Sequence, residues 1–445
     1  MNESAGWWQR RVWRLAGPII LSNVSVPLVG VVDTAVMGRL PDAAYIGAVA
    51  VAAVVFGFIS WGFNFLRMGT TGFTAQAQGG GDRTECVAVL LRGLLIAAAG
   101  GIAIIALQGL LIAWGLPLMH ASTQVTGLAE TYLRWRVWGA PATLAGLVIL
   151  GWLVGMQRTG AVFRLQLFLN GLNICLNLLF VLGLGWDVDG VALATVIAEY
   201  AALLLGLWEV RRVLGAFRPL PERARLLAPE RLLALFRVNR DIFLRTLAIV
   251  AVHAAFTAQG AALGDRTLAA NAILMQLLQV TAYGLDGFAY AVEALAGEAV
   301  GRRDRGAFRA AVRASSLSAL IVAVLIGAVF LFAGPWIVAV FTILPAVRAE
   351  TLLFMPWMAL LPLIAVWPYQ LDGIFTGATR TAPMRDTMIL AALVFLAGAW
   401  LLVPRLGNHG LWIALLAFNA ARGVGLGLCY PRLERSLGVT AARPA

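Results

Sequence analysis

The sequence predicts an all-α polytopic membrane protein with about twelve transmembrane helices in two six-helix lobes, and three observations support this fold class. Of the 445 residues, 61% are hydrophobic and only 13% are charged, whereas a soluble domain carries roughly 25% charged residues. Long apolar runs alternate with short polar breaks, and the second half of the chain repeats features of the first. The net charge of +12 comes from arginines dispersed over short loops, so we expect no nucleic-acid partner and attribute the charge to membrane topology.

The apolar runs are long enough to cross a hydrocarbon core of about 30 Å at 1.5 Å per residue. The expected spans are approximately 13–37, 46–78, 86–115, 127–154, 162–183, 190–210, 238–262, 268–299, 307–333, 350–378, 386–403 and 410–430. The second and eighth are long for one helix, so we expect them to be kinked or to protrude from the bilayer. The longest and most charged break follows the sixth span, which predicts an N-terminal lobe (1–210), a cytoplasmic linker (211–237) and a C-terminal lobe (238–445).

An internal repeat supports the two lobes. Identical or similar residues recur 222 positions apart, at Gly62/Gly284, Asn64/Asp286, Gly79/Gly301, Asp82/Asp304, Arg83/Arg305, Gly155/Gly377, Arg158/Arg380 and Thr159/Thr381. Because six spans per lobe is an even number, both lobes enter the membrane from the same side. The repeat is therefore expected to be parallel, with a pseudo-twofold axis along the membrane normal. Two such bundles around a central cleft are typical of alternating access.

Arginines predict the orientation of the chain. They gather before the first span, in the linker and after the even-numbered spans, whereas the opposite loops hold isolated cases at Arg39, Arg266, Arg348 and Arg405. By the positive-inside rule, this asymmetry places both termini in the cytoplasm.

Asp33 is the first candidate functional residue, because it is the only carboxylate in the first apolar run. A charged side chain at mid-membrane costs ~2.5–3.5 kcal/mol, so an Asp retained there usually faces a protein-lined or watery cavity. A carboxyl group that alternates between its neutral and charged forms can carry a proton. The alternative is that Asp33 lies in the headgroup zone, since Gly38 and Arg39 soon end the span.

Nothing in the sequence indicates an enzyme, a cofactor or a metal site. Cys86, Cys175 and Cys429 show no paired spacing that would indicate disulfides or a metal site. The chain has no H-E-x-x-H, G-x-S-x-G or phosphate-loop motif. A membrane-embedded enzyme would need acids, histidines or a nucleophile converging on one loop face, and no such cluster is found.

Several segments resemble the multidrug and toxic compound extrusion (MATE) transporters, more narrowly their DNA-damage-inducible (DinF) branch. They are LAGP at Leu15–Pro18, VDTAVMGRL at Val32–Leu40, LRMGTTGFTAQA at Leu66–Ala77, GVALATVIAEY at Gly190–Tyr200, YGLDGFAYAVEA at Tyr283–Ala294, LDGIFTGATR at Leu371–Arg380 and LGNHGLW at Leu406–Trp412. The resemblance covers nearly the whole chain. It implies twelve helices in two lobes and efflux driven by H⁺ or Na⁺.

The resemblance also assigns roles in the first helix. Asp33 matches the acid that this family uses as a proton-linked switch, and Pro18 matches a proline linked to bending of the helix. A proline inside a helix removes one backbone hydrogen bond and kinks the helix, which supplies a hinge. Pro27 lies closer to Asp33 and is a second candidate for the hinge.

The fifth span carries Asn170, Asn173 and Asn177, of which the last two lie four residues apart on one helix face. Many relatives have Asp at the position matching Asn177. An Asn cannot titrate, so its presence removes the second carboxylate beside Asp33 and weakens a Na⁺ site in this lobe. The alternative for these asparagines is hydrogen bonding between helices, which is common in membrane bundles.

The C-terminal lobe contains its own candidates for an ion or substrate site, namely Asp286, Glu293, Asp372 and His253. Asp286 and Glu293 lie seven residues apart and share a helix face. The Na⁺-driven branch of the family has an acid in the seventh span, and this chain has only His253 there.

Together these features predict proton-coupled antiport of amphipathic, often cationic, small molecules by a monomer in the bacterial inner membrane. The alternatives are Na⁺-coupled efflux and a lipid-linked-sugar flippase of the same superfamily. A flippase is expected to have a strongly basic cavity, whereas the arginines within the spans are few: Arg67, Arg245 and Arg422.

Overall fold

The computed structural model describes residues 5–40, 42, 44–215 and 221–437, and within these ranges it is helical without a strand. The α-helices are α1 (Ala5–Met37), α2 (Ala44–Gly62), α3 (Phe65–Gly79), α4 (Arg83–Ala106), α5 (Gln108–Gly115), α6 (Thr123–Arg136), α7 (Ala140–Gly155), α8 (Thr159–Asn177), α9 (Val188–Leu214), α10 (Arg223–Leu226), α11 (Pro229–Ala262), α12 (Asp265–Arg302), α13 (Arg305–Phe341), α14 (Pro345–Gly377), α15 (Ala382–Leu406) and α16 (Asn408–Ser436). Short 3₁₀ turns follow α5 and α6 (η1, Pro117–Met119; η2, Val137–Gly139), and a π-helical turn follows α8 (η3, Leu178–Gly183).

Within the described ranges, twelve helical stretches are long and apolar enough to cross a membrane. This confirms the predicted all-α membrane fold. The second stretch, Ala44–Gly79, is interrupted by a turn at Phe63 and Asn64, as its length suggested. The eighth, α12, is one helix of 38 residues, or about 57 Å, and so is longer than the hydrocarbon core.

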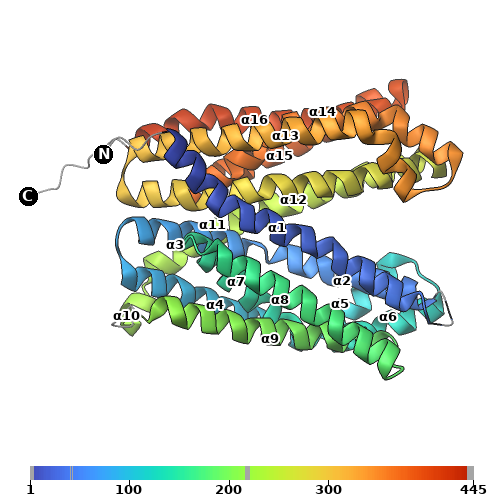
Figure 1. Cartoon of the computed structure of the whole chain (residues 1–445), viewed down its shortest axis with the longest axis horizontal. Coiled ribbons are helices and arrows are strands. Elements are labelled where there is room, and N and C mark those ends of the chain that lie inside the picture. Colours follow the sequence, from blue (N-terminus) through green and yellow to red (C-terminus); the bar gives the residue numbers. More distant parts are fainter. Residues whose placement is uncertain (1–4, 41, 43, 216–220, 438–445) are drawn as a thin grey trace, which may run out of the picture. The chain divides into compact units, whose positions relative to one another are not determined.

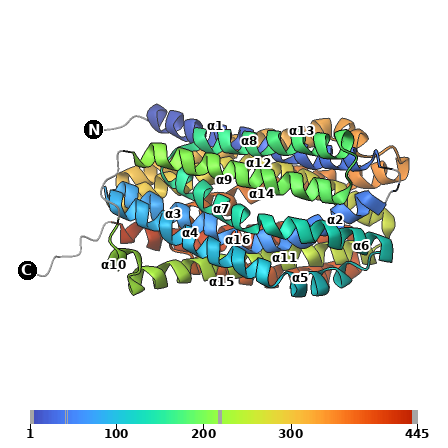
Figure 2. The same ribbon diagram turned by 90° about the horizontal axis from the view of Figure 1, so that it is seen from below.

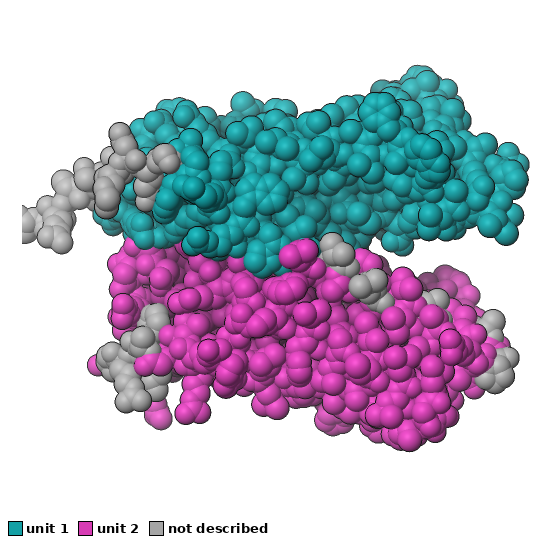
Figure 3. All heavy atoms as spheres, viewed as in Figure 1, with its two compact units in different colours: residues 1–20, 237–445 teal, residues 21–236 magenta. Residues whose placement is uncertain are grey.

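The chain forms two compact units, coloured separately in Figure 3: Met1–Ile20 with Arg237–Ala445, and Leu21–Phe236. The start of α1 packs with the C-terminal residues because Trp8, Val12 and Leu15 are buried in the same core as Leu285 and Phe288. Within the first unit, α12, α13 and α14 pack against one another, and Figures 1 and 2 show them running side by side. The lobes inferred from the sequence follow helix order rather than contacts, and their boundaries stay a prediction.

The backbone repeats at the spacing found in the sequence. Left-handed residues with positive φ occur 222 positions apart, at Gly81/Arg303, Gln157/Thr379 and Gly185/Gly407. The helix starts that follow the first pair are capped alike, because Asp82 accepts a hydrogen bond from the backbone N–H of Glu85 and Asp304 accepts one from Ala307. Residues with positive φ are uncommon outside glycine, and side-chain caps mark the starts of helices. Their recurrence at the same offset indicates that the two halves of the chain share one arrangement of helices and turns.

Close helix packing repeats in the same way. A Cβ atom on Gly151 of α7 would lie 2.3 Å from the carbonyl oxygen of Arg67 on α3, and one on Gly373 of α14 would lie 2.4 Å from that of Ala289 on α12. Both distances are shorter than real contacts, so only glycine fits. Small residues that let helix backbones approach closely are typical of membrane bundles.

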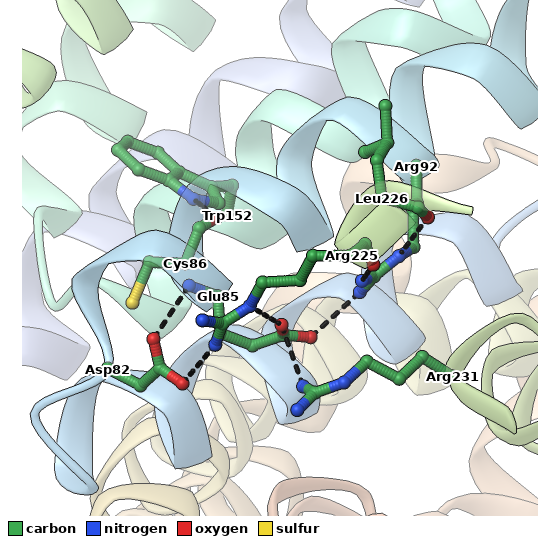
Figure 4. Close-up of polar contacts among 8 residues, drawn as sticks. All are labelled: Asp82, Glu85, Cys86, Arg92, Trp152, Arg225, Leu226 and Arg231. Carbon is green, nitrogen blue, oxygen red and sulfur yellow. Dashed lines mark hydrogen bonds and ion pairs between the residues drawn. The ribbon is translucent and has the colours of Figure 1, made fainter. Parts of the chain in front are cut away.

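Hydrogen bonds and ion pairs connect the predicted linker to the first turns of α4 (Figure 4). Arg92, which is 3% exposed, donates to the carbonyl oxygens of Arg225 and Leu226 at 2.7 and 2.8 Å and to Glu85 at 2.7 Å. Glu85 also pairs with Arg231 of α11 at 2.7 Å. The short helix α10 is therefore held by its backbone as well as its side chains. Pro219 and Arg218 of the predicted linker lie outside the described residues.

Candidate functional site

Asp33 lies in the last turns of α1 and is hydrogen-bonded to the end of α8. The Nδ2 atom of Asn177 donates to Asp33 Oδ1 at 2.5 Å and to Asn173 Oδ1 at 3.1 Å. Asn177 is fully buried, and Asp33 is partly buried. Asn177 is the last residue of α8 before the π-helical turn η3, and such turns are frequent at functional sites. Two of the residues singled out from the sequence are thus in direct contact.

A network of polar groups continues from this pair into the bundle. Asn173 Nδ2 donates to Thr195 Oγ1 on α9 at 2.9 Å, and Thr195 in turn donates to the carbonyl oxygen of Val191 at 3.0 Å. The buried side chain of Tyr132 on α6 also interacts with Thr195. We call Asp33, Asn173, Asn177, Thr195 and Tyr132 the N-lobe network. It connects α1, α8, α9 and α6, and Asp33 is its only carboxylate.

Asn170 contacts α1 at a different point. Its Nδ2 atom donates to Ser25 Oγ at 2.7 Å, and Ser25 donates to the carbonyl oxygen of Ser22 at 2.6 Å. Ser25 and Asp33 are eight residues apart and share a helix face. The second half of α1 therefore has side-chain hydrogen bonds to α8 at Ser25 and at Asp33, and the bond at Asp33 involves a titratable group.

Both candidate hinge prolines lie inside α1, which continues as one helix through them. The boundary between the two compact units falls between Ile20 and Leu21, two residues after Pro18. Pro27 lies between Ser25 and Asp33, in the segment attached to α8. A proline cannot donate a helical backbone hydrogen bond, so each leaves one backbone carbonyl group of α1 without its helical donor, and the hinge role stays a prediction.

Sequence reasoning missed Thr195 and Tyr132, and also a buried ion pair one helical turn beyond them. Arg136 on α6 forms a bidentate pair with Glu199 on α9, at 2.8 and 2.6 Å, and Thr143 on α7 donates to Glu199 at 2.9 Å. The pair connects the helices that carry the network. The spacing within each helix was readable from the sequence, because Tyr132/Arg136 and Thr195/Glu199 are each four residues apart, but the contact between the two helices was not.

In the C-terminal half the structure surrounds Asp372 with cations. Asp372 on α14 is paired with Arg245 of α11 and with Arg422 of α16, the latter at 2.9 Å. Arg422 also donates to Asn419 Oδ1 at 3.2 Å. The side chains of Asp372 and Arg422 are 8% and 7% exposed, so their charges neutralise one another within the bundle. The two arginines were noted in the sequence without their partner.

The other C-lobe candidates are spread over two helices. The side chain of Tyr369 interacts electrostatically with both Asp286 and Asp372. Glu293 is 1% exposed, and its carbonyl oxygen lies where α14 packs against α12, at Gly377. His253 on α11 interacts electrostatically with Arg422. Asp286 and His253 therefore interact with residues around Asp372, whereas Glu293 lies at the contact between α12 and α14.

The polar sites differ between the two halves although the scaffold repeats. At the offset of 222 residues, Asp33 corresponds to Ala255 and Asn177 to Ala399, while Asn173 corresponds to Phe395, a buried core residue. Only one half of the repeat thus contains the N-lobe network. In the part of the chain that the structure describes, no three His, Cys, Asp or Glu side chains are grouped as metal ligands.

Repeated bundles of membrane-crossing helices with a carboxyl group inside a polar network are typical of multi-pass membrane transporters. The family model MatE matches residues 18–179 and 242–401. The chain therefore belongs to the MatE family, the multidrug and toxic compound extrusion transporters, whose members are not enzymes.

Relatives and solved structures agree with this membership. The chain is 44% identical to DNA damage-inducible protein F of Escherichia coli over 427 residues, which cover 96% of this chain and 93% of the relative. It is 27% identical to a probable multidrug resistance protein NorM of Caulobacter vibrioides, covering 91% and 87%. An outward-facing structure of a multidrug resistance MATE family transporter superposes with a TM-score of 0.86 at 20% identity, covering 97% of both chains, which shows the shared fold.

Proposed function

We propose that this transporter exports amphipathic, often cationic, compounds in exchange for protons, and that Asp33 binds the proton. The observation that carries the proposal is the hydrogen bond between Asp33 and Asn177, because it places the one carboxylate of the N-lobe network against a neutral amide. A proton needs a single acceptor of this kind. The relatives named for multidrug resistance support an efflux function.

The same geometry favours H⁺ over Na⁺. The amide of Asn177 presents its N–H group to Asp33, so a cation beside that carboxylate would face the positive end of the amide dipole. In the other half, Asp372 is already paired with two guanidinium groups. A buried charge is stable only when it is paired, and neither site offers an unneutralised pair of carboxylates to a metal ion.

The proposed coupling acts through the attachment of α1. A hydrogen bond to a charged carboxylate is roughly twice as strong as one between neutral groups. Protonation of Asp33 therefore weakens its bond to Asn177, whereas the bond between Ser25 and Asn170 involves no titratable group and is unaffected. In this proposal, the weaker attachment at Asp33 makes bending of α1 after Pro27 easier. This bending, followed by rocking of the lobes, would release substrate outward and the proton inward by alternating access.

Substrate recognition is proposed from side-chain chemistry alone. Aromatic side chains occur along the spans, among them Trp61, Tyr283 and Tyr290. Aromatic faces attract flat cations by cation–π contact worth ~0.5–2 kcal/mol. We further propose that the protein acts as a monomer in the bacterial inner membrane, with both termini cytoplasmic as the arginine asymmetry predicts.

Ion-selective transport assays test the proposal. Purified protein in liposomes would be loaded with ethidium, and efflux measured with a proton gradient or a Na⁺ gradient imposed alone. We expect efflux under the proton gradient and none under the Na⁺ gradient. Efflux driven by Na⁺ alone would overturn proton coupling and favour the Na⁺-coupled alternative. No dye movement under either gradient would overturn the cationic-substrate proposal and shift weight to the lipid-linked-sugar flippase.

A further inference from the structure

A groove of about 480 Å³ opens between α13, α14 and α16, and the residues that line it are none of those assigned a role above. Its walls are mostly apolar, with Leu363, Ile364 and Trp367 from α14 and Val424 from α16, while Gly427 of α16 leaves space at its floor. Trp367 and Val424 are 46% and 63% exposed. Helix faces of this kind in a membrane protein are in contact with lipid.

One end of the groove is basic. Tyr430 lines this end and stacks on Phe308 of α13, with ring centroids 6.0 Å apart. Arg309 and Arg313 of the same helix act electrostatically on Tyr430. Arg309 is paired with Glu434, whereas Arg313 is exposed and forms no ion pair with another described residue. A cation is therefore available next to the apolar groove.

Neutral hydrogen-bonding groups lie between the basic end and the apolar walls. Gln370 and Ser316 both line the groove. Gln370 Oε1 accepts from Ser315 at 2.9 Å, and its Nε2 atom has no hydrogen-bond partner among the described residues although the side chain is only 1% exposed. The bond to Ser315 places Gln370 within one turn of Arg313 along α13. The order along the groove is thus cation, hydrogen-bond donors, then apolar wall.

We propose that this groove binds one anionic phospholipid, with its phosphate at Arg313, its ester region at Ser316 and Gln370, and an acyl chain along α14. The part of the groove on that helix from Gln370 to Leu363 spans about 10 Å at 1.5 Å per residue. It would therefore hold about two thirds of the acyl chain in one leaflet of the ~30 Å hydrocarbon core. Arginines beside the membrane surface attract anionic headgroups.

Native mass spectrometry of the purified protein tests the proposal. Wild type would be titrated with palmitoyl-oleoyl phosphatidylglycerol or phosphatidylcholine, and we expect one tightly held phosphatidylglycerol per chain. Arg313→Gln should weaken phosphatidylglycerol binding about fivefold and leave phosphatidylcholine binding unchanged. The matched control is Arg432→Gln, which removes an exposed arginine near the same end of α16 and should have no effect.

Filling the groove tests the acyl-chain part independently of charge. A Cβ atom on Gly427 would meet no other atom within 4 Å, so Gly427→Leu should fold and lose binding of both lipids. Val424→Trp blocks the same wall if the leucine variant is poorly produced. Retained binding in the blocked variants, or equal losses in Arg313→Gln and Arg432→Gln, would overturn the proposal.

Discussion

In the proposed mechanism, Asn177 decides what kind of ion the N-lobe network can hold. Its amide donates to Asp33 and to Asn173 with the same nitrogen, so it satisfies an ionised Asp33 without adding charge. An amide can also accept a hydrogen bond through its oxygen, which allows it to serve a protonated Asp33 after rotating. The residue therefore accommodates both forms of the carboxyl group without titrating itself.

Asn177→Asp is expected to create a Na⁺ response. The substitution would place a second carboxylate beside Asp33, with the oxygens of Asn173 and Thr195 nearby. Hard cations prefer such oxygen ligands. We expect Na⁺-driven dye efflux, absent in the wild type, to appear in this variant at about ten times the background leak, as a gain of about 1.4 kcal/mol in ion binding would allow.

Asn170→Asp is the matched control, because Asn170 bonds Ser25 and stands outside the N-lobe network. An equal gain of Na⁺ response in both variants would show that added charge in α8, rather than its position beside Asp33, is responsible.

Residue-level prediction succeeded where helical spacing places groups on one face and failed where contact partners come from other helices. The spacing of Asn173 and Asn177 was readable from the sequence, and so was the isolation of Asp33. The pairing of Asp372 with Arg245 and Arg422 was not, because the three residues come from α14, α11 and α16. No periodicity within one helix records which side chains of distant helices meet.

At the scale of elements, the linker is more ordered than its composition suggests. The proline-rich, charged break contains α10, whose backbone carbonyl groups accept hydrogen bonds from the buried Arg92. Composition predicts a boundary there but does not reveal that an arginine of α4 reaches the backbone of the linker. The attachment is thus a tertiary feature with no local sequence signal.

Removing that attachment should destabilise the linker first. Arg92→Leu leaves Glu85 without one of its cations and two carbonyl groups without donors, and breaking a buried ion pair costs about 3–5 kcal/mol. Hydrogen–deuterium exchange should show faster exchange of the α10 amides, and thermal unfolding should show a lower melting temperature. Arg223→Leu, which removes an exposed arginine of α10 itself, serves as the control, and equal acceleration in both variants would contradict a specific role for Arg92.

For the whole molecule, the internal repeat includes the helices, turns and caps of the scaffold but not the N-lobe network. Turns, caps and close glycine contacts recur at one offset, whereas the N-lobe network has apolar counterparts. The sequence predicted the fold because hydropathy and repeated glycines are strong, local signals. It predicted the polar contacts less completely because the N-lobe network lies at positions where the two halves differ.

The repeat predicts paired sensitivity to a single methyl group. Gly151→Ala and Gly373→Ala should each lower the free energy of unfolding by about 1–3 kcal/mol, because the added Cβ overlaps a carbonyl oxygen of the facing helix. Gly146→Ala on α7 meets nothing within 4 Å and should melt like wild type. Thermal unfolding in detergent would measure all three, and a loss confined to one half would contradict equivalent packing in the two repeats.

Proton-driven efflux by Asp33→Asn tests the central claim most directly. The variant would be compared in liposomes with wild type and with Asp265→Asn, which makes the same change at an exposed acid at the start of α12. Size-exclusion chromatography would establish that each protein is folded. We predict that efflux under an imposed proton gradient is lost in Asp33→Asn and retained in Asp265→Asn. Efflux at the wild-type rate in folded Asp33→Asn would contradict the assignment of proton coupling to Asp33.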